Sequence, residues 1–206
     1  MKFMKTEKIT VTRKYFLYFL LVGLVSMALH ELGHYVAAKI IGIDAFFRAF
    51  NQIVFLWNEI PKTDINVGIV LLSGPLVTIF LSYLGLYFLH TQKKFKELWT
   101  SFVLFNIRPI YILASLFFVN LNTHDEFYFF NYMGWNQIYL LLIYSIVSYL
   151  PVKYIFDNLN VKKTGKMIFF IESFFFTLVV IGITLLIDRS VLAIQLNLIY
   201  NSKYLL

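Results

Sequence analysis

The chain has no cysteine among its 206 residues. This absence excludes disulfide bridges, zinc sites built from cysteine thiolates and a cysteine nucleophile. Histidine is also scarce, occurring only at positions 30, 34, 90 and 124. Four histidines are too few for a histidine-rich di-iron membrane enzyme, so that class is excluded as well.

Charged residues are few, at 14% of the chain against 60% hydrophobic residues. Because soluble domains carry about 25% charged residues, we predict an all-α polytopic integral membrane protein. The length allows about five or six spans of roughly 20 residues and leaves no room for a separate soluble domain. The net charge is +7, but the basic residues flank apolar runs. There they set topology and contact lipid, so no nucleic-acid partner is expected.

Five apolar segments are long enough to cross a bilayer. They cover about 15–41, 66–89, 99–121, 136–156 and 167–187. The tail from Asp188 to Leu206 is expected to be an amphipathic or interfacial helix. Residues 43–65 mix aromatic and β-branched residues with polar ones, which predicts one or two short membrane-associated strands, a re-entrant segment or a plain amphipathic linker.

The basic segments alternate with loops that carry few basic residues. Lysine and arginine gather at the N-terminus, at 93–96 and at 162–166, whereas 43–65 and 122–135 carry only two. The positive-inside rule then predicts a cytoplasmic N-terminus, five crossings and a C-terminus outside, in the plasma membrane of the cell.

The first span contains the pentad His30-Glu31-Leu32-Gly33-His34. Such polar residues inside a membrane-length segment are costly unless they serve a function. Two histidines four residues apart leave the same face of a helix and can hold one Zn²⁺ ion. Glu31 is then placed to act as a general base on water. The alternative is a structural one, in which these side chains only bridge helices through hydrogen bonds.

The depth of the pentad points to a third ligand. A helical rise of about 1.5 Å per residue puts His30 roughly 22 Å and His34 roughly 28 Å from the inner end of the span, in the outer half of the bilayer. The loop after the third span opens on the same side. It offers Asp125, our predicted third ligand because carboxylate is a usual one, with His124 and then Glu126 as alternatives. If the third span stays helical to residue 121, Asp125 lies about 8–10 Å above His34. In the alternative interpretation, residues 124–126 form a solvated loop and bind no metal.

Three segments together resemble a known family. They are the pentad followed by Tyr35 and Ala38, the segment Ser73-Gly74-Pro75-Leu76, and Asn106 with Pro109. In these segments the chain is similar to the site-2 protease family of intramembrane zinc metallopeptidases. The resemblance implies short membrane-inserted strands at 43–65 and a role for Asn106 in binding the substrate strand or steadying the oxyanion. The zinc-binding aspartate of that family would fall near Ala114, where this chain has none.

These observations predict a single membrane domain, residues 1–206, whose core at 15–135 carries the zinc site and whose residues 136–206 add further helices. The predicted activity is a zinc metalloendopeptidase that hydrolyses a membrane-protein or signal-peptide-like segment. An inactive zincin-like membrane protein that binds a partner or confers immunity is the alternative, and a metal transporter is a third. Arg108 and Glu172 are expected to form a structural ion pair across the spans.

Overall fold

The computed structural model describes residues 9, 12, 14–49, 52–56, 64–92, 94–107 and 125–203. Six helices and two strands lie in these ranges. In chain order they are α1 (Lys14–Ile40), β1 (Asp44–Ala49), β2 (Gln52–Leu56), α2 (Asp64–Thr91), α3 (Lys96–Phe105), α5 (Asp125–Tyr132), α6 (Gln137–Asn158) and α7 (Lys163–Lys203).

The all-α membrane class is confirmed, but the count of long helices differs from the predicted five. Among the described residues, four helices are long and apolar enough to cross a membrane: Lys14–Ile40, Ile65–Thr91, Ile138–Asn158 and Lys163–Asp188. The expected third span at 99–121 is interrupted, because α3 has only ten residues and ends at Asn106, its C-cap. Pro109 follows three positions later in the sequence, and a helix usually ends before a proline. The rest of that predicted span, from residue 108, lies outside the described residues.

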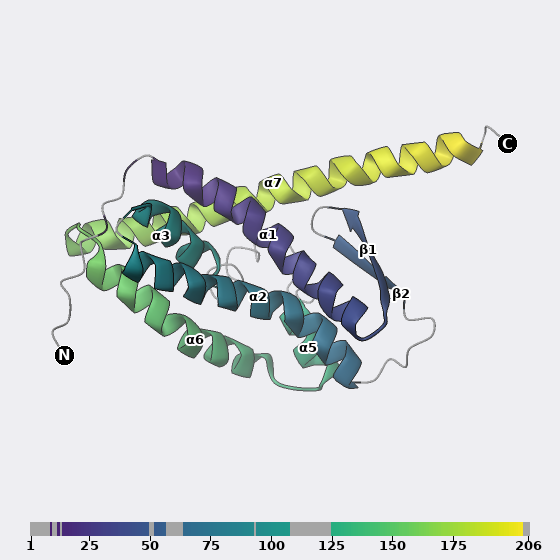
Figure 1. The fold of residues 1–206 in the computed structure, drawn as a ribbon, viewed down its shortest axis with the longest axis horizontal. Coiled ribbons are helices and arrows are strands. Elements are labelled where there is room, and N and C mark those ends of the chain that lie inside the picture. The colour runs from purple at the N-terminus through teal and green to yellow at the C-terminus, as the bar shows by residue number, and fades with distance from the viewer. Residues whose placement is uncertain are drawn as a thin grey trace.

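The first half of α1 lies in the main apolar core. Tyr15, Phe19 and Val22 are almost fully buried there, against residues of α3, α6 and α7. Figure 1 shows α1 between α2 and α7, with α7 crossing it and projecting beyond the other helices. The crossing is close at Gly23, where an added Cβ would lie 2.7 Å from a methyl group of Val180. A small residue at this point lets the two helices approach each other.

The segment after α1 forms an antiparallel hairpin, which confirms strands rather than a plain linker over its described part. Asp44 pairs with Leu56 and Phe46 with Val54. The turn that separates α1 from β1 contains Gly42 at φ 83°, a left-handed conformation that costs glycine little and ends the helix. β1 contacts both α1 and α7, and the hairpin lies beside the C-terminal end of α1 (Figure 1).

One further expectation was wrong, because the predicted loop at 122–135 contains the helix α5. The tail from Asp188 is helical as predicted over its described part, but it continues the fifth predicted span in a single helix of 41 residues, α7. After Gly182 no glycine or proline interrupts the sequence of α7. The charged pair at positions 188 and 189 ends the apolar run, but it does not end the helix, because charged residues are compatible with helical backbone.

Candidate metal centre

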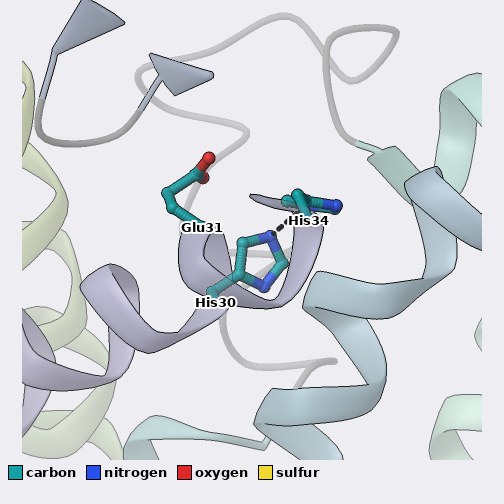
Figure 2. Close-up of side chains that lie close together, drawn as sticks. All are labelled: His30, Glu31 and His34. Atoms are coloured by element: carbon teal, nitrogen blue, oxygen red, sulfur yellow. Dashed lines mark hydrogen bonds between the residues drawn. The ribbon is translucent and has the colours of Figure 1, made fainter. Parts of the chain in front are cut away.

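The two histidines of the pentad meet on one face of α1. His30 and His34 are one helical turn apart and are 9% and 3% exposed. Their rings lie nearly perpendicular, with centroids 4.8 Å apart, and their Nε2 atoms are 3.2 Å apart. Figure 2 shows the pair on the ribbon of α1, with the contact between the rings dashed. The helical spacing therefore directs both Nε2 atoms to the same point.

Helix α2 packs closely against this face through glycines. A Cβ added at Gly33 would lie 3.0 Å from the backbone oxygen of Ser73 and 3.2 Å from the Cα of Gly74. Side chains larger than hydrogen would push the helices apart here, as is usual where membrane helices cross through small residues. This crossing places Ser73-Gly74 directly beside the histidines.

The backbone of α2 also sets the orientation of the His34 ring. His34 Nδ1 donates a hydrogen bond to the carbonyl oxygen of Val70 at 2.6 Å. Ser73 Oγ donates to the same carbonyl at 2.7 Å and lies 3.3 Å from Nδ1. Because the proton of a neutral ring is then on Nδ1, His34 Nε2 carries a lone pair. This is the arrangement that a metal-ligating histidine needs.

Asp125, the first residue of α5, completes a triangle of donor atoms. Its Oδ2 lies 3.0 Å from His30 Nε2 and 3.1 Å from His34 Nε2. Its side chain is 33% exposed, whereas the two imidazole side chains are 11% and 4% exposed. The gap of about 8–10 Å that was expected between Asp125 and His34 does not exist. That expectation assumed a third span that stays helical to residue 121, whereas α3 ends at Phe105.

The geometry of these three atoms fits a zinc ion. At Zn–N distances of about 2.0–2.1 Å, tetrahedral ligand atoms are separated by about 3.3 Å; here the three separations are 3.0, 3.1 and 3.2 Å. The lone pair of His34 Nε2 and the Asp125 carboxylate repel each other unless a proton or a cation lies between them.

The backbone of α2 leaves room for that ion. A Cβ at Gly74 would lie 2.3 Å from His34 Nε2 and 2.8 Å from His30 Nε2. Glycine at this position therefore keeps open the space beside both nitrogens.

Glu31 lies next to this triangle without belonging to it. It is 9% exposed, and its carboxylate and the nitrogens of His30 and His34 all lie within 4.8 Å of one another. The carboxylate stands to one side of the two rings, not between them (Figure 2). At that distance it can exchange a proton with a water molecule held at the triangle.

Asn106 lies deeper in the protein, at the end of α3. It is 2% exposed, and its Nδ2 donates to Ser26 Oγ at 3.0 Å and to the carbonyl of Phe102 at 2.8 Å. Its Oδ1 has no hydrogen-bond partner among the described residues. Both roles that the resemblance implies, binding the substrate strand and steadying the oxyanion, stay predictions.

Several predicted residues lie outside the described part of the chain. These are Arg108, His124 and the side chain of Glu126. Glu172 is exposed on α7, so its expected pairing with Arg108 stays a prediction. The sequence did not predict that Val70, Ser73 or Gly74 lies at the metal centre. The Ser-Gly-Pro segment is nevertheless a signal in the sequence for close packing of α2 on the pentad.

Comparison of the chain with protein-family models, with curated proteins and with solved structures found no match. The case for a function therefore rests on the residues of the centre themselves. They are a histidine pair and a carboxylate with the spacing of zinc ligands, and a second carboxylate beside them.

Proposed function

We propose that this protein is an intramembrane zinc metalloprotease, similar to the site-2 proteases, that hydrolyses peptide bonds in or near transmembrane segments. The convergence of His30 Nε2, His34 Nε2 and Asp125 Oδ2 within 3.2 Å carries the proposal. Helix α1, which bears the histidines, is long and apolar enough to lie in a lipid bilayer.

In the proposed mechanism His30, His34 and Asp125 would hold the ion. When bound there, zinc would supply Lewis-acid chemistry, lowering the pKa of a water molecule and polarising the scissile carbonyl. Glu31 takes the proton of the attacking water on a carboxylate oxygen and delivers it to the nitrogen of the leaving amine. The Val70 carbonyl keeps the His34 ring in the tautomer that leaves Nε2 free to ligate.

The substrate must present an extended stretch to this centre, because a helix hides its carbonyls in hydrogen bonds. The proposed substrate is a membrane-protein or signal-peptide-like segment that unwinds locally. We place the protein in the plasma membrane as part of this proposal. The positive-inside pattern supports a cytoplasmic N-terminus, an external C-terminus and the centre in the outer half of the bilayer. Asp125 is the most exposed of the three ligands, at one third, and we propose that water reaches the centre on its side.

Metal analysis combined with a cleavage assay tests the proposal. Purified wild-type protein is expected to hold one zinc per chain, and His30→Ala and Asp125→Ala to lose it. Glu31→Gln should keep the zinc but cleave a co-expressed tagged membrane segment about 10² to 10⁴ times more slowly. A wild-type protein without zinc, or undiminished cleavage by Glu31→Gln, would contradict the proposal.

One observation favours a second candidate, a zincin-like protein without catalysis that binds a partner or confers immunity. The carboxylate at the histidines comes from α5, whereas in the family it would fall near Ala114. On this alternative, the protein would still bind zinc, but Glu31→Gln would leave its partner binding, or the immunity that it confers, unchanged.

A further inference from the structure

A groove of about 530 Å³ runs between α2 and α5. Its size is within the range of small-ligand sites, about 300–1,000 Å³. The α2 wall consists of Ile65, Gly68, Ile69, Leu72, Ser73 and Leu76. Phe129 and Met133 form the α5 wall. Among the described residues that line this α2–α5 groove, Ser73 alone has a polar side chain.

Both walls of the groove lead to the candidate metal centre. On α2, the lining residue Ser73 contacts His34 Nδ1 at 3.3 Å. On α5, Asp125 precedes the lining residue Phe129 by four positions, so the two share a face of the helix. The walls touch at Gly68, where an added Cβ would lie 3.1 Å from the Phe129 ring. The Ser73 end of the groove therefore borders the candidate metal centre.

We propose that the α2–α5 groove binds an apolar side chain of the substrate polypeptide next to the scissile bond. This inference rests on the proposed function, because it assumes that a peptide carbonyl is bound at the centre. A carbonyl held there places the flanking residue of the same chain beside Ser73, which lines the groove and contacts His34. The lining is apolar, so burial of a leucine-like side chain is favourable.

A peptide is favoured over a lipid molecule as the occupant because of where the groove lies. Its lining residue Ser73 contacts His34 of the candidate metal centre. A polypeptide whose carbonyl is bound at that centre therefore has its neighbouring side chain beside the groove.

Two zinc-chelating probes test the groove on the full chain in lipid nanodiscs supplied with Zn²⁺. Acetohydroxamate anchors at the metal with a methyl group, and 4-methylpentanoyl hydroxamate anchors there with a leucine-like group. Affinities are measured by calorimetry, without any cleavage assay. In the wild type the larger probe is expected to bind at least about ten-fold tighter, because its extra carbons are buried.

Variants that fill the groove identify where those carbons lie. Ile69 and Leu76 line the groove but are 43% and 60% exposed, so Ile69→Trp and Leu76→Trp add volume without disturbing a packed core. Both are expected to reduce the advantage of the larger probe to within about two-fold. Leu142→Trp on α6, at a position that is 53% exposed and outside the groove lining, is the matched control and should keep the full advantage.

Each outcome decides one of the two proposals. If acetohydroxamate binds but the larger probe has no advantage, or keeps its advantage in both filled variants, lipid occupies the groove or the side chain lies elsewhere, and the subsite is wrong. If a zinc-loaded wild type binds neither probe, the proposed protease function fails, and the subsite fails with it.

Discussion

The two halves of α1 are packed in different ways. In its first half, Tyr15, Phe19 and Val22 bury bulky side chains among aromatic rings of α3 and α7. In its second half, Gly33 faces Gly74 of α2, and the buried groups are the imidazoles and the Glu31 carboxylate. We infer that the first half of α1 stabilises the fold. In the second half, polar side chains that can bind an ion are buried in place of bulky apolar ones.

The largest effect is expected in the first half. Phe19 is fully buried and its ring lies 5.6 and 5.7 Å from those of Tyr15 and Phe105. Phe19→Ala should lower the free energy of unfolding by about 3–5 kcal/mol, because it leaves a cavity. Thermal unfolding in detergent measures this, with Leu17→Ala, at a 59% exposed position, as the control. Zinc stoichiometry at low temperature should not change; a loss of zinc in Phe19→Ala would show that the halves are not separable.

The next effect tests the second half at Gly74. Gly74→Ala places a methyl group 2.3 Å from His34 Nε2, in the space that we assign to the ion. We expect zinc affinity to fall by more than about 100-fold, as measured by chelator competition. Gly182→Ala is the control, since a Cβ there meets nothing within 4 Å. Unchanged affinity in Gly74→Ala would place the ion elsewhere.

A smaller effect is expected at Ser73, which supports the His34 ring through the Val70 carbonyl. Ser73→Ala should weaken zinc binding by about 10- to 100-fold, in the range typical of groups that orient metal ligands. Thr78→Ala is a matched control, because Thr78 donates a similar bond to Pro75 within the same helix and touches neither histidine. If Ser73→Ala and Thr78→Ala bound zinc with equal affinity, Ser73 would be a helix-packing residue that does not support the His34 ring.

The smallest effect lies where the two halves meet. Ser26→Ala and Asn106→Ala both remove the buried bond between α1 and α3, and each should cost about 1 kcal/mol of stability. Only Asn106→Ala also removes the amide group that the family resemblance predicts to bind the substrate strand. A rise in KM in Asn106→Ala alone would support that role; equal KM values would leave Asn106 a structural residue.

Much of the fold followed from local patterns. The apolar runs predict the long helices, and the β-branched and aromatic residues after Gly42 allow short strands, because these signals are carried by neighbours in sequence. The short α3 was missed because the apolar pattern continues past Asn106. The full length of α7 was missed because hydropathy reports burial in lipid and not where a helix ends.

By itself, the sequence determined that His30 and His34 share one face of a membrane-length helix, because a separation of four residues is nearly one helical turn. It also nominated Asp125 by the side of the membrane on which its loop opens. Only the tertiary structure decided that Asp125 Oδ2, His30 Nε2 and His34 Nε2 lie within 3.2 Å of one another, and that Gly74 leaves space beside them. The reason is physical: those contacts depend on how α2 and α5 pack against α1, and no local periodicity encodes the packing between separate helices.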